Sequence, residues 1–331
     1  MSPLLAIRDL SIVLDDGQGR MPIVADMAFD LEAGETLGVV GESGSGKSLL
    51  ALALIGLLPG GAQVSGSIRF DGEELVGRDE DAYCQLRGSR IAMIFQEPMT
   101  ALNPSMRVGD QIAEGLRLGG MDREAARERA LNLLDRVRIT DARQRMASYP
   151  HELSGGQRQR VMIAIALARN PALLIADEPT TALDTTVQAE ILDILAELVA
   201  DLGMALILVS HDLGVIARAT RRTLVMYAGT RFEDGATAEI LGTPRNPYTQ
   251  ALLAARPARR TAAAEVLRPR PRLAAIPGVV PAYAALPPGC RFADRCARRI
   301  AACDDGEPAW RELSDGRGVR CLRAGEQDQG A

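Results

Sequence analysis

Short apolar runs alternate with amphipathic helical patterns along most of the 331-residue chain. This alternation is typical of an α/β domain. Runs that are almost wholly apolar predict buried parallel strands, and they span 36–40, 90–96, 172–178 and 204–212. Runs in which apolar and polar residues alternate predict an antiparallel edge sheet, and they span 4–14, 23–31 and 66–75.

Two further segments differ from this pattern. Residues from about 97 to 150 are polar with apolar positions at helical spacing, so we expect a helical insertion between strands, with Asp122 as an N-cap. After residue 250 the chain is rich in Pro, Arg and Ala and reads as linker or extended packing. We therefore expect one domain over 1–250, with a helical subdomain at about 97–170, and an extension over 251–331.

Composition excludes several classes of protein. The formal net charge of -5 argues against a general nucleic-acid binder, so no nucleic-acid partner is expected. No apolar run reaches the roughly 18 residues of a membrane span, and the first residues lack the pattern of a signal peptide. We expect a cytosolic protein that touches membranes only through partners, whose five cysteines are free thiols or metal ligands.

The segment GESGSGKS follows the apolar run 36–40 and opens a helical pattern. This strand–loop–helix context predicts a loop whose amides bind the phosphates of a nucleotide. It also contains Lys47, the only lysine among 38 lysine and arginine residues. A compact ammonium fits such a loop better than the broad fork of arginine. The expected ATP-binding residues here are Gly41, Glu42, Ser43, Gly44, Ser45, Gly46, Lys47 and Ser48, the last of them also a magnesium ligand.

A second anion site is predicted at LSGGQRQR, residues 153–160. Ser154 is expected to be an N-cap, and Gly155 and Gly156 leave the first amides of the following helix bare. This site has no lysine, unlike the phosphate loop. Together with Gln157, these residues form the second predicted phosphate-binding segment.

With these motifs in order, residues 1 to about 250 resemble the ATPase subunit of an ABC transporter. The segments that carry the resemblance are 41–48, Gln96, 153–157, 173–179, Asp184 and His211. The resemblance implies an α/β P-loop NTPase fold with a RecA-like parallel core sheet, an antiparallel β subdomain and a helical insertion. It also implies half of a dimer that holds two ATP, in which Ser154, Gly155, Gly156 and Gln157 complete the site of the partner.

The resemblance assigns further roles to residues at strand ends. Asp177 ends an apolar run, where a buried carboxylate is costly unless Mg²⁺ or another cation pairs with it. By resemblance, Glu178 is the general base and His211 contacts the γ-phosphate. Gln96 is expected to reach Mg²⁺ or the attacking water, and Asp184 to lie at the subunit interface.

The chain departs from the family in one respect, the residue that stacks on adenine. Members usually have an aromatic residue there, upstream of the phosphate loop. Phe29 is the only aromatic residue before position 41, and its alternating strand context predicts a core position instead.

Residues 95–112 and 246–257 and the tail resemble the peptide and nickel importer branch of the ABC ATPases. The tail carries four cysteines without a C-x-x-C pair: Cys290, Cys296, Cys303 and Cys321. By resemblance they hold a [4Fe–4S] cluster; a zinc site and unligated thiols are the alternatives. Nearby arginines are expected to balance the charge of thiolates, and they are Arg291, Arg295, Arg298 and Arg299.

The implied function is an ATP-hydrolysing motor subunit that drives import of di- or oligopeptides, nickel or a related small solute. The implied partners are a second ATPase subunit, of the same or a related kind, two membrane permease subunits and an external solute-binding protein. The implied location is the cytoplasmic face of the inner membrane, as a peripheral protein. The alternative is a soluble ABC ATPase acting on a macromolecular complex, although such proteins usually carry two cassettes or a long coiled-coil insertion.

Overall fold

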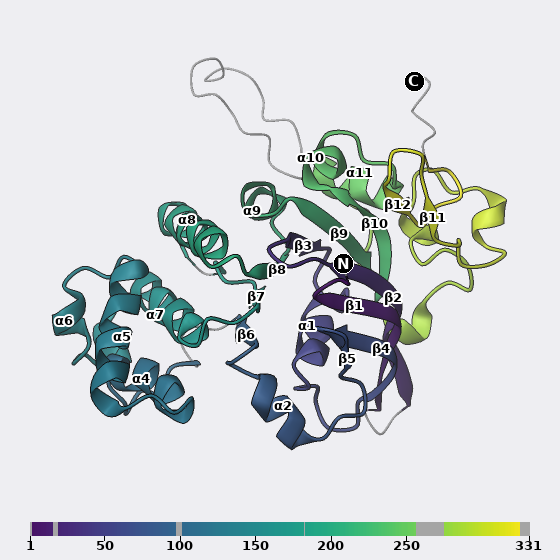
Figure 1. Ribbon diagram of the computed structural model, residues 1–331. Helices are drawn as coiled ribbons and strands as arrows, with labels where there is room; N and C mark the ends of the chain where they lie inside the picture. The colour runs from purple at the N-terminus through teal and green to yellow at the C-terminus, as the bar shows by residue number, and fades with distance from the viewer. Residues whose placement is uncertain (1, 16–18, 97–100, 182, 256–274, 325–331) are drawn as a thin grey trace, which may run out of the picture.

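The computed structural model describes residues 2–15, 19–96, 101–181, 183–255 and 275–324, and Figure 1 shows their arrangement. The Arg-rich stretch 256–272 lies outside these described residues. Two sheets form the body of the molecule, with a helical subdomain on one side and a loop-rich C-terminal region on the other (Figure 1). This arrangement agrees with the expected α/β architecture of two sheets and a helical insertion.

The smaller sheet is antiparallel, as expected from its alternating sequence pattern. Its strand order is β2-β1-β4-β5, and the bounds are β1 Leu5–Asp15, β2 Arg20–Leu31, β4 Gln63–Phe70 and β5 Glu73–Glu74. Leu5 and Ile7 of β1 turn inward and are fully buried, and after a register shift Leu10 and Ile12 do the same. They share one hydrophobic cluster with Leu50 and Leu54 of α1 (Lys47–Leu54), the helix that follows the phosphate loop.

The larger sheet has the strand order β11-β12-β10-β9-β3-β8-β7-β6. Its strands are β3 Thr36–Val40, β6 Ile91–Ile94, β7 Leu173–Asp177, β8 Ala205–Ser210, β9 Arg222–Tyr227, β10 Thr230–Ala236, β11 Arg311–Glu312 and β12 Gly318–Val319. The four strands predicted to be parallel, β3, β6, β7 and β8, are parallel, and β9 joins them beside β3. Because the parallel strands run in one direction, the residues that follow β3, β7 and β8 meet at one edge of the sheet.

Helices cover this sheet and form the insertion. The helical subdomain contains α4 Val108–Leu118, α5 Arg123–Arg136, α6 Ala142–Arg145 and α7 Gly155–Leu167. The remaining helices are α2 Glu80–Leu86, α8 Thr185–Leu202, α9 Leu213–Ala219, α10 Thr237–Gly242 and α11 Pro247–Ala254. The predicted N-cap is confirmed, since the Asp122 carboxylate accepts hydrogen bonds from two amides of the first turn of α5.

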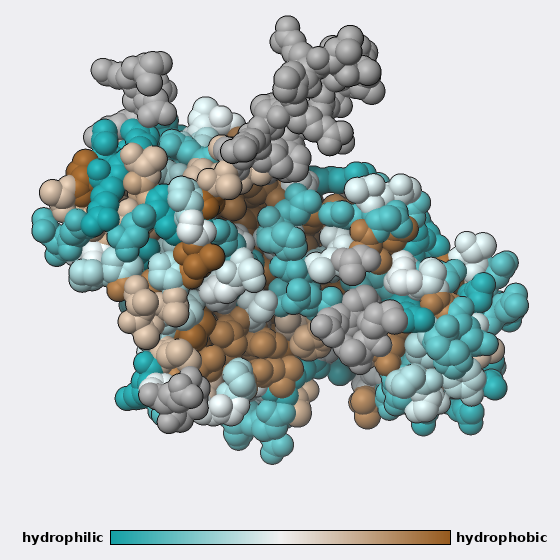
Figure 2. Space-filling model, turned by 180° about the vertical axis from the view of Figure 1, so that it is seen from behind, coloured by the Kyte–Doolittle hydropathy of each residue, from teal (hydrophilic) through white to brown (hydrophobic). Residues whose placement is uncertain are grey.

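The surface is polar over the helical subdomain and more apolar across the middle of the rear face (Figure 2). None of the helices in the described ranges is both long and apolar enough to cross a membrane.

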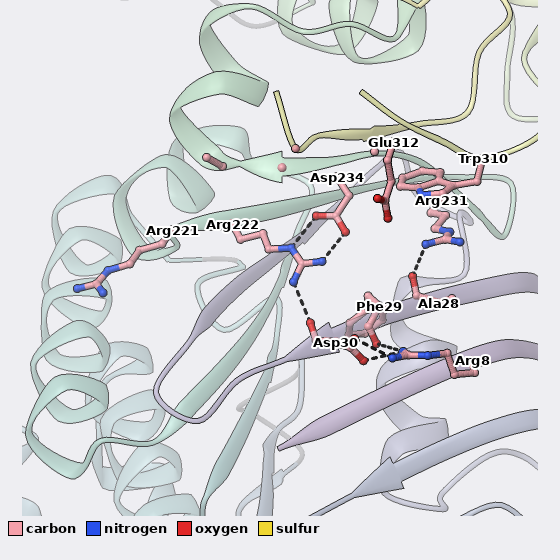
Figure 3. A pocket seen from close by; sticks show the side chains of 14 residues that line it. Arg8, Ala28, Phe29, Asp30, Arg221, Arg222, Arg231, Asp234, Trp310 and Glu312 are labelled. Carbon is pink, nitrogen blue, oxygen red and sulfur yellow. Dashed lines mark hydrogen bonds and ion pairs between the residues drawn. The ribbon is translucent and has the colours of Figure 1, made fainter. Parts of the chain in front are cut away.

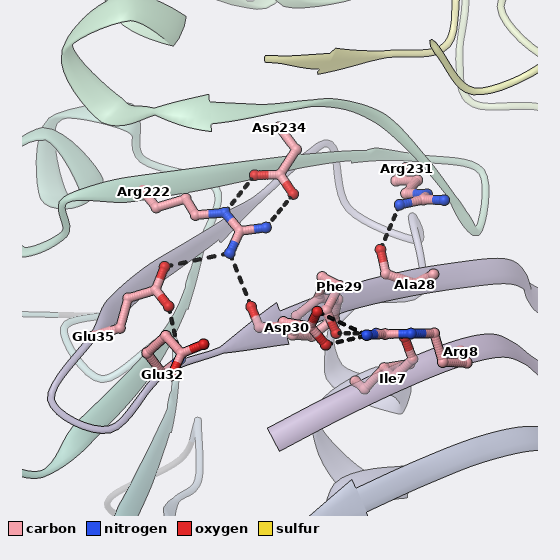
Figure 4. A network of polar contacts seen from close by, with 10 residues as sticks. All are labelled: Ile7, Arg8, Ala28, Phe29, Asp30, Glu32, Glu35, Arg222, Arg231 and Asp234. Atoms are coloured by element: carbon pink, nitrogen blue, oxygen red, sulfur yellow. Dashed lines mark hydrogen bonds and ion pairs between the residues drawn. The ribbon is translucent and has the colours of Figure 1, made fainter. Parts of the chain in front are cut away.

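A polar network joins the two sheets (Figure 4). Arg222 of β9 forms a bidentate pair with Asp234 of β10, with N···O distances of 2.8 and 2.6 Å. The same guanidinium donates to the carbonyl oxygen of Asp30 in β2, at 2.8 Å. Next to this network lies a pocket of ≈ 720 Å³ between β2, β10 and the C-terminal region, where Trp310 stacks on Arg231 (Figure 3). No residue of the phosphate loop lines this pocket, so it is separate from the predicted nucleotide site.

The C-terminal region, residues 275–324, is attached to the larger sheet through β12. Glu233 and Asp234 of β10 pair with Val319 and Gly318 in antiparallel register. Residues 232–236 and 318–319 therefore belong to one sheet, although they lie on either side of the predicted boundary at residue 250. That boundary remains a prediction.

Candidate active site

The phosphate loop leaves β3 at Val40 and enters α1 at Lys47. Gly44 and Gly46 have φ values of 78° and 92°, in the left-handed region that side chains rarely adopt. A Cβ atom at Gly46 would also lie 2.9 Å from the carbonyl oxygen of Ile23. Glycine at position 46 is therefore required both by the turn of the loop and by the close approach of β2.

Lys47 lies under this loop with only 5% of its surface exposed. Its Nζ donates hydrogen bonds to the carbonyl oxygens of Gly41 and Glu42, both at 2.9 Å. Burial lowers the pKa of Lys47, and the nearby carboxylates of Glu178 and Asp177 oppose that shift. The ammonium is thus fixed at the point toward which the loop curves, where it would face bound phosphates.

Asp177 ends β7 beside the start of α1 and is 5% exposed. The hydroxyl of Ser48 lies beside its carboxylate, and Oδ1 of that carboxylate has no hydrogen-bond partner among the described residues. Burial raises the pKa of Asp177, which means that its charged form lacks full compensation. An unpaired buried carboxylate oxygen next to a hydroxyl fits the oxygen ligands that Mg²⁺ prefers.

Glu178 follows Asp177 with a φ of 47°, an uncommon backbone conformation for a residue other than glycine. Its carboxylate interacts with His211 Nδ1 at 2.9 Å and accepts hydrogen bonds from Thr181 Oγ1 at 2.9 Å and Gln96 Nε2 at 3.0 Å. Burial raises the pKa of Glu178, but the bonds from His211 and Thr181 hold it below its ordinary value. The group is therefore ionised at neutral pH and can accept a proton.

Residues predicted at the ends of four strands, β3, β6, β7 and β8, thus meet at one place: Lys47, Gln96, Asp177, Glu178 and His211. The side chain of Gln96 donates a hydrogen bond to Glu178. Its predicted contact with Mg²⁺ or the attacking water remains a prediction. Thr181 was not predicted, because nothing in the sequence distinguishes it from the neighbouring threonines.

The LSGGQ segment lies at the N-terminus of α7, and the predicted N-cap is confirmed. Ser154 Oγ accepts from the amide of Gln157 at 3.3 Å, and Gln157 Oε1 accepts from the amide of Ser154 at 3.0 Å. Ser154 and Gly155 are exposed, while a side chain at Gly156 would meet Val187 of α8. Within the described ranges, no hydrogen bond joins residues 154–157 to the phosphate loop. Asp184 is the N-cap of α8.

Phe29 is not available to contact adenine. It is 4% exposed and belongs to the core of the smaller sheet, as its strand pattern predicted. The phosphate loop is instead contacted from the other end of the chain. Tyr283 Oη donates to the carbonyl oxygen of Gly44 at 3.2 Å, and Arg295 pairs with Glu42. Both contacts are too remote in sequence for a local pattern to reveal.

The four C-terminal cysteines lie together around one small cavity: Cys290, Cys296, Cys303 and Cys321. The amides of Arg298 and Arg323 donate to the sulfurs of Cys296 and Cys321, both at 3.4 Å. Burial, together with the charges of the other three thiols, raises the pKa of Cys290 to about 12. In the described part of the chain, no group of three or more His, Cys, Asp or Glu is arranged to hold a single metal ion.

The arginines near these thiols differ from the expected charge-balancing set. Burial raises the pKa values of Cys296 and Cys321, and the charge of Arg298 opposes that rise. Arg299 instead pairs with two surface carboxylates, Arg291 with Glu307, and Arg295 with Glu42 of the phosphate loop. The expectation for Arg295 was wrong because its long side chain reaches across to the partly buried carboxylate of Glu42.

Comparison with known proteins agrees with this geometry. The family model described as "ABC transporter" matches residues 24–181, and the one described as "Oligopeptide/dipeptide transporter, C-terminal region" matches residues 232–303. Putative peptide import ATP-binding proteins of Brucella abortus and Brucella suis are each 48% identical over 322 residues. These alignments cover 97% of this chain and 95% of each relative.

Solved structures of ATP-binding cassettes are also similar. A dimeric cassette, MJ0796, bound to ADP and Pi has a TM-score of 0.63 at 27% identity, over 70% of this chain and 98% of its own. CbiO1 from Clostridium perfringens, part of the transporter complex CbiONQ, has a TM-score of 0.64 at 28% identity, over 73% of this chain and 92% of its own. The chain therefore belongs to the ABC transporter family, as an ATP-binding protein of the peptide-import type whose cassette is an ABC ATPase.

Proposed function

We propose that this chain hydrolyses ATP at the phosphate loop and that hydrolysis drives import of di- or oligopeptides or a related small solute. One observation carries the proposal. The ionised carboxylate of Glu178 is held by three side chains directly beside Asp177 and within the field of Lys47. A fixed base next to a phosphate loop is what attack of water on a bound phosphate requires.

Each residue then has a role in the reaction. The loop amides and Lys47 hold the phosphates, and Ser48 and Asp177 hold Mg²⁺, which neutralises phosphate charge when bound. Glu178 orients the attacking water and accepts its proton. His211 and Gln96 keep the Glu178 carboxylate in place, and His211 is exposed enough to reach the γ-phosphate as well.

The LSGGQ segment is proposed to act in a dimer. Ser154 and Gly155 are exposed at a helix N-terminus, which favours an anion, and they belong to the helical subdomain rather than to the phosphate loop. The similar cassette MJ0796 is dimeric. We propose that residues 154–157 contact ATP held by a second ATPase subunit, of the same or a related kind, and that Asp184 lies at that interface.

The remaining proposed partners are two membrane permease subunits and an external solute-binding protein, with this chain peripheral at the cytoplasmic face of the inner membrane. The test is reconstitution of all subunits in proteoliposomes. A labelled peptide is supplied on the side of the solute-binding protein, and nucleotide on the side of this chain. We expect uptake with Mg-ATP and none with a non-hydrolysable analogue. Uptake that persists when this chain is omitted would contradict the proposal.

For the C-terminal cysteines we propose a [4Fe–4S] cluster. The support is four thiols around one cavity, with amides two residues further along donating to sulfur, a hydrogen bond that stabilises cluster thiolates. A cationic iron core would also compensate thiolates that burial disfavours. Zinc and unligated thiols are the alternative occupants.

The cluster has a spectroscopic test. Protein purified without oxygen should show a broad visible absorption band and about four iron and four sulfide per chain. Cys303→Ser should lose both, while Cys84→Ser, at an exposed cysteine outside the cavity, should keep them. Zinc in place of iron, or a colourless protein without metal, would rule the cluster out.

A further inference from the structure

The phosphate loop contains an acidic side chain, Glu42, directly after its first glycine. A carboxylate beside a site for polyphosphate is unfavourable, because like charges repel. Glu42 is close enough to Lys47 for its charge to act on that ammonium. Binding of a polyphosphate at this loop therefore requires a cation that compensates the negative charge of Glu42.

Arg295 provides that charge compensation from the C-terminal region. Its two terminal nitrogens pair with both carboxylate oxygens of Glu42, with Nη1–Oε2 at 2.7 Å and Nη2–Oε1 at 2.9 Å. The side chain of Arg295 is only 5% exposed and that of Glu42 25% exposed. A bidentate pair shielded from water is both stronger and more fixed in direction than a surface ion pair.

Further contacts hold the pair in one position. Arg295 Nε donates to the carbonyl oxygen of Pro277 at 2.7 Å, and Nη1 donates to Tyr227 Oη at 3.2 Å. The amide of Glu42 donates to Tyr248 Oη at 2.9 Å. The guanidinium and the start of the loop are thus anchored to β9, α11 and the C-terminal region together.

We propose that Arg295 is a positioning residue for nucleotide binding: by neutralising and orienting Glu42 it allows the phosphate loop to accept a triphosphate. The inference rests on the proposed binding of ATP at this loop. Without Arg295, the Glu42 carboxylate would be left partly buried and unpaired next to the phosphates. The loss of binding affinity should be larger for ATP than for ADP, because ATP brings more negative charge to the loop.

The test is a double-mutant cycle read by calorimetric Kd values for Mg-ATP and Mg-ADP. We expect Arg295→Met to raise the Kd of Mg-ATP about tenfold or more, and that of ADP less. The double variant Glu42→Gln/Arg295→Met should recover most of the ATP affinity, since the charge that needed compensation is gone. Arg299→Met is the matched control, because Arg299 is nearby but pairs with Asp294 and Asp304 at the surface.

The outcomes separate this inference from the proposed function. Equal Kd values for wild type and Arg295→Met, or a double variant as weak as the single one, would overturn the inference alone. No binding of Mg-ATP by the wild type would overturn the proposed function and the inference with it. If Arg295→Met does not fold, Glu42→Gln decides: the unneutralised Arg295 should then tighten ATP binding, and weaker binding would overturn the inference.

Discussion

Replacing Glu178 with Gln is expected to reduce ATP hydrolysis by about 10²–10⁴-fold while ATP remains bound. The amide keeps the size of the side chain, and its one oxygen can still accept the hydrogen bonds from Thr181 and Gln96. Its NH2 group replaces the oxygen that faces His211, and it cannot accept the proton of the attacking water. The phosphate loop, Lys47 and Asp177 are untouched, so the affinity for Mg-ATP should be retained. Phosphate release and a Kd measured on the same preparation check both halves of the expectation.

The control for this variant is Glu197→Gln on α8. Glu197 is exposed, and among the described residues it pairs with Arg138 of the helical subdomain and with no residue of the site. It should leave hydrolysis unchanged. If Glu178→Gln released phosphate at the wild-type rate, another group would have to be the base, and the role given to Glu178 would be withdrawn.

Replacing Lys47 with Met is expected to abolish tight nucleotide binding, raising the Kd for Mg-ATP by about 10²-fold or more. The ammonium faces the loop amides from a buried position, where its interaction with phosphate is little screened. Lys47→Arg should fail almost as completely. Its charge is kept, but the planar fork is too broad for a position bounded by the carbonyl groups of Gly41 and Glu42.

Loss of folding would not explain such a result. Burial lowers the pKa of Lys47, so the folded chain already disfavours this charge, and methionine removes the cost of burying it. The thermal midpoint of Lys47→Met should therefore be at least that of the wild type. A Met variant that folds and binds Mg-ATP normally would mean that the phosphates lie elsewhere.

Much of the cassette could be predicted from the sequence because its signals are local. The residue types within the apolar run 172–178 and the loop 41–48 are enough to predict a buried strand and a phosphate loop. The structure places β7 and the start of α1 at these positions. The strand β9, Arg222–Tyr227, was not predicted. It begins with a charged residue whose partner, Asp234, is supplied by the next strand.

The contacts that the sequence could not reveal join residues far apart in the chain. Arg295 lies 253 residues from Glu42, and Tyr283 lies 239 residues from Gly44. No local sequence pattern around Tyr283 or Arg295 predicts such a distant partner. Motifs could therefore predict which side chains gather at the strand ends, but not which residues of the C-terminal region hold the phosphate loop.

The pairing of β12 with β10 has a consequence for aggregation through the edge of the larger sheet. Without β12, and β11 beyond it, β10 would present unpaired amides and carbonyl groups at the edge of the sheet, a surface that recruits strands from other molecules. The C-terminal region moves that rim outward to β11, which is only two residues long and carries Arg311 and Glu312. A short, charged terminal strand is a poor template for further pairing, so the same region that reaches the phosphate loop also guards the sheet against aggregation.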